Sequence, residues 1–153
     1  MNIRTPETYV NEILEHLQAE CEQDFDALMD SMTDDCFNFV VADPTSPYVG
    51  PVEVEARYRK LFAAFPDLKV EIRRLITLDV ERNIAVTENR LWGTHEGELF
   101  GIPPSGKPIE IRALVQWDFG DDGKVRGETV YYDLATILRQ IGYLTLPGRG
   151  GES

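Results

Sequence analysis

The sequence has few of the residues that mark metal-dependent or disulfide-stabilised proteins. It contains two cysteines and two histidines in 153 residues. Cys21 and Cys36 both lie beside apolar residues, so we expect core thiols and no disulfide. His16 and His95 are far apart and lack the spacing of metal ligands, so we expect no metal site.

Several diagnostic segments are also missing. No apolar run approaches the roughly 20 residues of a membrane helix, and the first residues lack the continuous apolar core of a signal peptide. We therefore expect a cytoplasmic protein without membrane contact. The sequence has neither a glycine-rich nucleotide loop nor a GxSxG nucleophile motif. These absences argue against a bound nucleotide, and we expect no cofactor.

Positive charge is scarce. The chain has 15 basic and 27 acidic residues, a formal net charge of -12. Such a field repels phosphate backbones, which excludes nucleic acid as the expected partner. It says little about small neutral ligands, so a small hydrophobic molecule remains the expected partner.

What is present is the composition of an ordinary globular domain. Hydrophobic residues make up 42% and charged residues 27% of the chain, close to the averages of folded domains. No repeat or low-complexity segment divides it. We expect one domain over residues 1–146 and a flexible C-terminal tail over 147–153.

The N-terminal part predicts helices. A helix is expected to begin at Pro6, after Thr5 as N-cap. Three-four spacing predicts its buried face, whereas His16 lies off the strongest stripe and is expected to be solvated. A short helix is expected over 25–32. The residues of the buried face are Tyr9, Val10, Ile13, Leu14, Leu17 and Cys21.

The next segments change in character along the chain. Residues 37–41 form a short apolar run typical of a strand, and the proline-containing stretch 42–50 is expected to be a loop. A third helix should begin at Pro51 and end before Pro66.

The remainder predicts strands. Alternating apolar residues indicate strands over 68–72, 84–94, 109–119 and 125–132. Asp133 could cap a last short helix. Helices followed by long strands favour an α+β fold in which a curved antiparallel sheet wraps over the N-terminal helices and leaves a pocket at its open end.

The strand over 109–119 leaves open which face lines the pocket. Ile111, Val115 and Trp117 share one parity, and Arg112 and Gln116 share the other. Arg112 and Gln116 could line the pocket, face water or face a dimer partner, and a bulge would exchange the two faces.

Three segments together resemble a known family. They are Phe65-Pro66-Asp67-Leu68, the pair Gly93-Thr94-His95-Glu96-Gly97 and Gly101-Ile102-Pro103-Pro104-Ser105-Gly106-Lys107, and Tyr132-Asp133-Leu134 with the following Leu138-Arg139-Gln140-Ile141-Gly142. Their order and distances resemble the SnoaL-like polyketide cyclase (ester cyclase) family of the NTF2-like superfamily, over about residues 8–143. The resemblance implies an NTF2-like cone, usually a homodimer, and a cofactor-free intramolecular aldol closure.

The resemblance also implies positions for the cyclase chemistry. The acid/base aspartate of the cyclases corresponds to Val130, and a histidine two residues earlier corresponds to Glu128. Asp133 and Asn38 match an aspartate and an asparagine of the family. Since valine cannot carry a proton, the cyclase mechanism does not transfer unchanged.

Side-chain alternation offers a substitute. Glu128 shares a strand face with Val130 and Tyr132, so it should point into the same pocket. We expect Glu128 to carry any acid/base function, with His95 and Arg112 as helpers. His95 could instead brace its loop, and Asp133, also a catalytic candidate, could act only as a helix cap. The expected pocket residues are Asn38, Trp92, Arg112, Gln116, Val130 and Tyr132.

Two functions follow as hypotheses. The first is cofactor-free acid/base catalysis, by aldol cyclisation or related isomerase or hydrolase chemistry, on a small hydrophobic carbonyl compound. The alternative is a non-catalytic module that binds a small hydrophobic ligand, because the acid/base position is Val130. Convergence of a carboxylate and a second polar group in one pocket would favour the enzyme.

Overall fold

Four helices form in the computed structural model, which describes residues 4–147. They are α1 (Pro6–Glu22), α2 (Phe25–Asp30), α3 (Pro51–Ala64) and α4 (Leu134–Gln140). Proline occupies the first turn of both α1 and α3, where its missing N–H costs nothing. Of the tail predicted over 147–153, residues 148–153 lie outside the described part of the chain.

Within these described residues, six strands form one sheet. They are β1 (Met32–Val40), β2 (Tyr48–Val49), β3 (Lys69–Asp79), β4 (Ile84–Thr94), β5 (Pro108–Phe119) and β6 (Val125–Tyr132). Their order is β2-β1-β6-β5-β4-β3. The pairs from β3 to β6 are antiparallel, as predicted, but β1 and β6 are parallel. Between β1 and β6 the chain forms β2, α3 and the strands β3, β4 and β5. It then returns to β1, and β6 runs beside β1 in the same direction.

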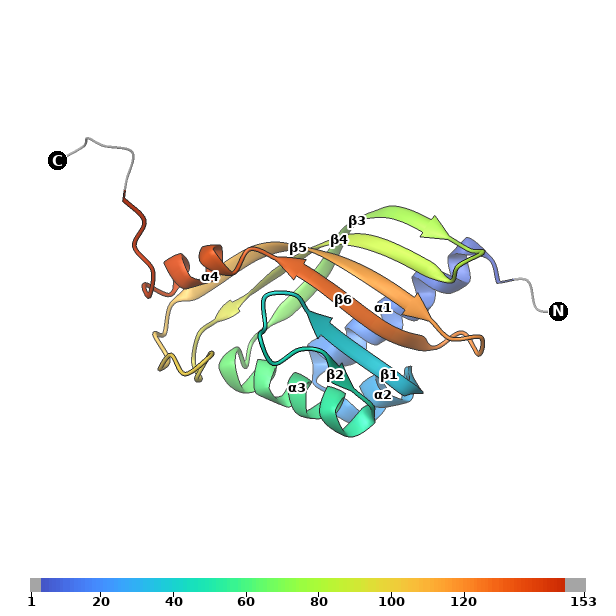
Figure 1. The fold of residues 1–153 in the computed structure, drawn as a ribbon, viewed down its shortest axis with the longest axis horizontal. Helices are drawn as coiled ribbons and strands as arrows, with labels where there is room; N and C mark the ends of the chain where they lie inside the picture. Colours follow the sequence, from blue (N-terminus) through green and yellow to red (C-terminus); the bar gives the residue numbers. More distant parts are fainter. Residues whose placement is uncertain (1–3, 148–153) are drawn as a thin grey trace.

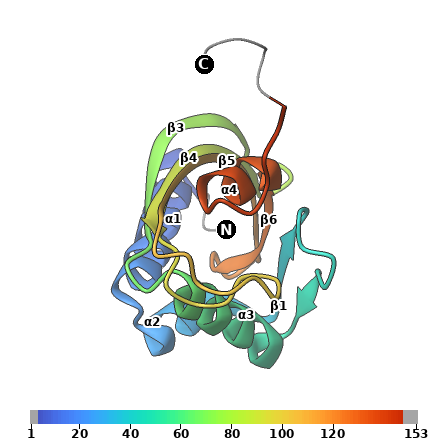
Figure 2. The same cartoon turned by 90° about the vertical axis from the view of Figure 1, so that its left-hand side faces the viewer.

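The sheet curves around the helices, which confirms the predicted α+β fold. Figure 2 shows β3, β4 and β5 arching over the interior, with α1 on one side and α3 below. Figure 1 shows α4 at one end of the sheet, after β6. The helices α1, α2 and α3 each contact strands of the sheet, so the core lies between its concave face and these helices.

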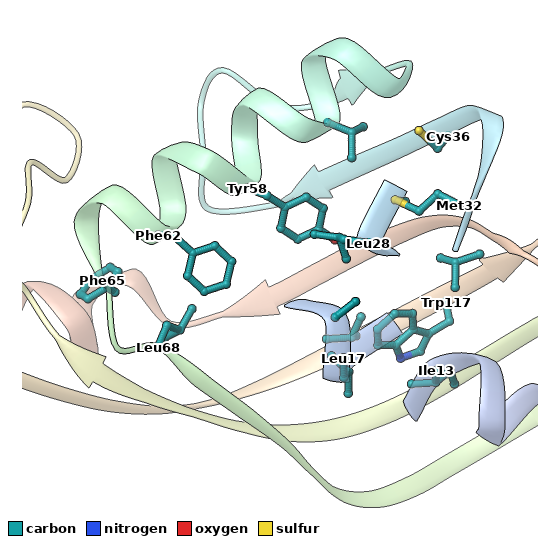
Figure 3. Packing of buried hydrophobic residues seen from close by; sticks show 14 of the residues in the cluster. Ile13, Leu17, Leu28, Met32, Cys36, Tyr58, Phe62, Phe65, Leu68 and Trp117 are labelled. Carbon is teal, nitrogen blue, oxygen red and sulfur yellow. The ribbon is translucent and has the colours of Figure 1, made fainter. Parts of the chain in front are cut away.

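Large apolar side chains fill that core. In Figure 3, Tyr58 and Phe62 of α3 point toward Leu28 of α2 and the sheet, and Trp117 of β5 lies near Ile13 and Leu17 of α1. Tyr58, Leu28 and Trp117 are fully buried. Each such side chain contributes on the order of 2 kcal/mol by leaving water. This packing brings together α1, α3 and β5, three elements that line the cavity described below.

The N-terminal boundaries differ from the sequence prediction at several points. The strand expected over 37–41 spans Met32–Val40, and Tyr48–Val49, within the expected loop 42–50, form β2. The second helix ends at Asp30, and Met32, expected as its last residue, begins β1. Met32 is buried and pairs with Val125 of β6, so sheet pairing outweighs its helical propensity.

Both cysteines are free thiols. Cys36 is buried, whereas Cys21 is half-buried and its Sγ accepts a hydrogen bond from the Val70 amide at 3.3 Å. Within residues 4–147, no helix combines the length and the apolar character needed to cross a membrane.

Candidate active site

An apolar cavity of about 80 Å³ lies between the concave face of the sheet, α1 and α3; we call it the inner cavity. Most of its wall is aliphatic or aromatic, and four polar side chains interrupt it, those of Glu20, Arg57, Asn89 and Glu128. The apolar wall residues are Leu17, Leu61, Phe65, Leu68, Val70, Leu91, Leu99, Ile109, Ile111, Val115, Val130, Tyr132 and Ile137. A few polar groups in an apolar cavity are typical of small-molecule sites.

Glu128 is the polar group of this cavity whose side chain is fixed by two hydrogen bonds. It lies on β6 and is 5% exposed. Its Oε2 accepts a hydrogen bond from Asn38 Nδ2 at 2.8 Å and a second from the Tyr58 hydroxyl. Both donors stabilise the ionised carboxylate. The site therefore holds a buried acceptor-only group in a fixed orientation.

A hydrogen-bonded chain continues from Tyr58 to α1. The Tyr58 hydroxyl oxygen lies 3.1 Å from His16 Nε2, and His16 Nδ1 lies 2.8 Å from Ser31 Oγ. The Ser31 hydroxyl donates to the Leu28 carbonyl, so its oxygen accepts from His16 Nδ1. That leaves Nε2 of a neutral His16 as an acceptor facing Tyr58.

This series of hydrogen bonds can stabilise Glu128 both when it is ionised and when it is protonated. When Glu128 is ionised, the Tyr58 hydroxyl donates to it. When Glu128 is protonated, its own hydroxyl can donate to Tyr58, whose hydrogen then turns to His16 Nε2. Burial lowers the pKa of His16, against the opposing charge of Glu128, and so favours the neutral ring that this exchange requires.

Glu20 is a second buried carboxyl beside the first. It lies on α1, one helical turn after His16, and is 5% exposed. One oxygen of Glu20, one of Glu128 and a ring nitrogen of His16 all lie within 4.8 Å of one another. Burial, and then the charge of Glu128, raise the pKa of Glu20 to about 8, while Arg57 opposes the shift. At neutral pH a proton therefore resides on Glu20.

The same three side chains are the described residues best placed to hold a metal ion. The hydroxyl of Tyr58, however, contacts both His16 Nε2 and Glu128 Oε2. Because Nδ1 of His16 already contacts Ser31, Nε2 is the ring nitrogen that a metal would need, and the Tyr58 hydroxyl lies against it. The donor set therefore fits a proton-transfer network better than a metal centre.

Several predicted site residues are brought together here. Glu128, Val130 and Tyr132 line the inner cavity from one face of β6. Asn38 lies behind Glu128, fully buried, and the two are register partners in the β1–β6 pair. Asn38 thus positions the carboxylate rather than forming the cavity wall. The catalytic and binding roles of these residues remain predictions.

Three predicted pocket residues lie elsewhere. Arg112 and Gln116 extend from the outer face of β5, where Arg112 pairs with Glu88 and Gln116 bonds Asp118. Trp92 lies on the outer side of β4 under the Arg90 guanidinium. None of the three lines the inner cavity, because β4 and β5 direct the residues of the opposite parity inward.

His95 is buried but belongs to a loop. Its Nδ1 contacts the Ser105 hydroxyl at 3.0 Å and accepts from the Ser105 amide at 3.2 Å. Its ring lies 5.7 Å from that of Phe65, and it does not line the inner cavity. The bonds to Ser105 support the loop-bracing interpretation, and the structure does not place His95 beside Glu128 as a helper.

Asp133 caps α4. Its carboxylate accepts from the Ala135 amide at 3.0 Å and the Thr136 hydroxyl at 2.7 Å. The Thr136 hydroxyl is the main cause that lowers the pKa of this exposed group. Asp133 does not line the inner cavity, so the structure supports its capping role and not a place beside the reacting group.

Several polar residues of the site were not predicted from the sequence, among them Tyr58, Arg57 and Asn89 and, on α1, His16 and Glu20. His16, expected to be solvated, is fully buried, and that prediction is wrong. Glu20 was not considered. Helical spacing could have identified His16 and Glu20. The three-four interval of one buried face includes Ile13, His16, Leu17 and Glu20. Leu14, assigned to that face, is 50% exposed.

Comparison with known proteins places the chain in a family. The profile of the SnoaL-like polyketide cyclase family matches residues 12–141. The chain therefore belongs to this family, as its motifs suggested. A comparison with curated protein sequences found no match.

Solved structures show the same fold at low sequence identity. A putative SnoaL-like polyketide cyclase from Jannaschia sp. CCS1 has a TM-score of 0.80 at 22% identity, covering 93% of this chain and 98% of that one. IdmH, a putative polyketide cyclase from Streptomyces antibioticus, has a TM-score of 0.72 at 22% identity, with 88% and 98% covered. A protein with a ketosteroid isomerase-like fold from Catenulispora acidiphila has a TM-score of 0.71 at 16% identity, with 97% and 100% covered.

Proposed function

We propose that this protein is a cofactor-independent acid/base catalyst that acts on a small hydrophobic carbonyl compound. The observation that carries the proposal is the buried pair of carboxyl groups at the inner cavity. One of them, Glu20, holds a proton to about pH 8, and the other, Glu128, accepts two hydrogen bonds. A carboxyl group that holds its proton, next to one that accepts hydrogen bonds, is a pair suited to act as acid and base.

The proposed first step is enolisation. Glu128 takes the proton from a carbon next to the carbonyl, the C–H electron pair forms the new carbon–carbon double bond, and the carbonyl oxygen takes the proton of Glu20. The products are an enol, protonated Glu128 and ionised Glu20. Tyr58 and His16 stabilise protonated Glu128 by the exchange of hydrogen bonds described above.

A cyclisation would complete the reaction without any other reactant. The enol carbon adds to a second carbonyl carbon of the same molecule, and the oxygen of that carbonyl takes the proton from Glu128. The enol hydroxyl returns its proton to Glu20. The net change is an isomerisation that restores both carboxyl groups, in keeping with membership of the polyketide cyclase family.

The test measures enolisation directly. In D₂O, the protein should accelerate deuterium incorporation next to the carbonyl of 2-tetralone, an apolar ketone, above the rate in buffer. Glu128→Gln should remove the acceleration. Glu110→Gln, which alters an exposed carboxylate paired with Arg90 outside the cavity, should retain it. A protein-independent rate would contradict the proposal.

We also propose a homodimer and a cytoplasmic location. The outer face of the sheet carries exposed apolar side chains from adjacent strands, among them Leu114 of β5 and its register partner Tyr131 of β6. None of the helices α1, α2 and α3 covers this face (Figure 2). Pairing of two copies through it would remove this apolar surface from water.

A further inference from the structure

A second, outer cavity of about 430 Å³ adjoins the first. The two cavities share four lining residues, which are Arg57, Leu61, Leu99 and Tyr132. A ligand whose reacting group lies at Glu128 would therefore extend past these residues toward the outside. Since the inner cavity is small, the rest of any larger ligand must occupy the outer one.

Arg57 is the only cation on the wall of the inner cavity, among the residues the structure describes. It lies on α3 and is half-buried, with its guanidinium carbon 5.3 Å from the centre of the Tyr58 ring. Tyr58 in turn bonds Glu128. Arg57 is thus separated from the proposed base by one side chain.

Several acidic groups around Arg57 are engaged by other partners. Asp43, also on the outer cavity, accepts bonds from the Thr45 amide and hydroxyl and from the Tyr48 hydroxyl. Glu55, on the same helix, pairs with Arg59. Glu128 accepts from Asn38 and Tyr58.

Glu20, a further carboxyl near Arg57, is protonated at neutral pH because its pKa is about 8. Glu98 also lines the outer cavity, but it forms no ion pair with Arg57. Across residues 4–147, no ion pair or hydrogen bond is formed by the Arg57 side chain. Its five N–H donors are therefore available to a ligand.

We propose that Arg57 binds a carboxylate group of the substrate, so that the substrate class is an apolar carbonyl compound bearing one carboxylate remote from the reacting carbon. A planar guanidinium matches a carboxylate through two parallel hydrogen bonds. A doubly charged phosphate is disfavoured, because Asp43 and Glu98 together outweigh Lys60 on the same outer cavity and the whole chain has a net charge of -12. The inference rests on the proposed function only in taking the inner cavity as the reaction site.

The test compares two probes of similar shape, 2-naphthoate and 2-acetylnaphthalene. Where the first has a carboxylate oxygen, the second has a methyl group. Calorimetric titration should show 2-naphthoate binding about tenfold more tightly or better, the effect of a charge-assisted hydrogen-bonded pair. Arg57→Gln should abolish that preference, and Arg57→Lys should retain part of it. Arg59→Gln, on the same helix but paired with Glu55, should leave it unchanged.

Each contrary outcome overturns the inference. These are equal binding of the two probes, no detectable binding of 2-naphthoate at millimolar concentration, or a preference that survives in Arg57→Gln. Because binding is measured without turnover, a failure of enolisation leaves this result intact. Loss of the preference with enolisation retained would refute the carboxylate site alone.

Discussion

Asn38 and Glu128 are register partners across the parallel β1–β6 pair, and the Asn38 amide nitrogen lies 2.8 Å from Glu128 Oε2. Ninety residues of chain separate them, yet the sheet fixes their side chains on the same side. The alignment of these two strands is therefore part of the site. Any change that shifts β1 along β6 should remove the donor from the carboxylate.

Gly127 controls that alignment. A β-carbon there would lie 2.2 Å from a ring atom of Phe37, the residue preceding Asn38. We predict that Gly127→Ala lowers the free energy of unfolding by about 1–3 kcal/mol, as overpacking does, and reduces enolisation.

Urea unfolding and the deuterium assay measure these effects. The double variant Gly127→Ala, Phe37→Ala should recover part of the lost stability, since the clashing ring is gone. If Gly127→Ala unfolds like the parent, the close approach does not constrain the strands.

Glu20 should make stability depend on pH. Its pKa is 4.5 in the unfolded chain and about 8 in the folded protein. The folded state therefore binds the proton more tightly, so the free energy of unfolding should fall as pH rises from about 4.5 to about 8. One pKa unit corresponds to about 1.4 kcal/mol, so the fall should be on the order of a few kcal/mol.

Urea titrations at several pH values measure this slope. Glu20→Gln should flatten it, and Glu15→Gln, on the exposed side of the same helix, should leave it unchanged. A wild-type stability that rises with pH over this range would show that Glu20 is ionised at neutral pH.

Asp133 should matter for stability alone. Asp133→Ala removes the cap of α4, and the loss should be about 1 kcal/mol in the free energy of unfolding. Enolisation per folded molecule should stay at the parent rate. A variant that melts like the parent but no longer enolises the ketone would instead give Asp133 a catalytic role.

How far the sequence predicts the site depends on the element. In β6, alternation alone placed Glu128, Val130 and Tyr132 on one face. In β5 the same rule favours Ile111 and Val115 as the inward residues, but it cannot by itself exclude a bulge, so Arg112 and Gln116 stayed candidates.

The helix α1 was harder to interpret for a physical reason. A buried face is recognised by apolar residues, and His16 and Glu20 are polar. They are buried because they contact residues distant in sequence. His16 contacts Tyr58 and Ser31, and Glu20 lines the cavity beside Glu128. Such partnerships become visible only when the fold brings α1, α3 and β6 together.

The outer sheet face should mediate the proposed dimer. We predict a dimer mass by light scattering at micromolar concentration. Leu114→Lys, Tyr131→Lys should give a monomer, because two charges would face each other across the pair of copies. Val52→Lys, at an 84% exposed apolar position on α3, should remain dimeric. A wild-type monomer would refute the proposal.

The pH dependence of enolisation tests the central claim, that Glu128 and Glu20 act as base and acid. The measurement is the rate of deuterium incorporation into 2-tetralone between pH 5 and pH 10, corrected for buffer. We expect a wild-type rate that falls above about pH 8, as Glu20 loses its proton. We also expect a lower rate without that fall for Glu20→Gln, and no acceleration for Glu128→Gln. An unaltered rate in Glu128→Gln, or a wild-type rate that keeps rising through pH 8, would contradict this claim.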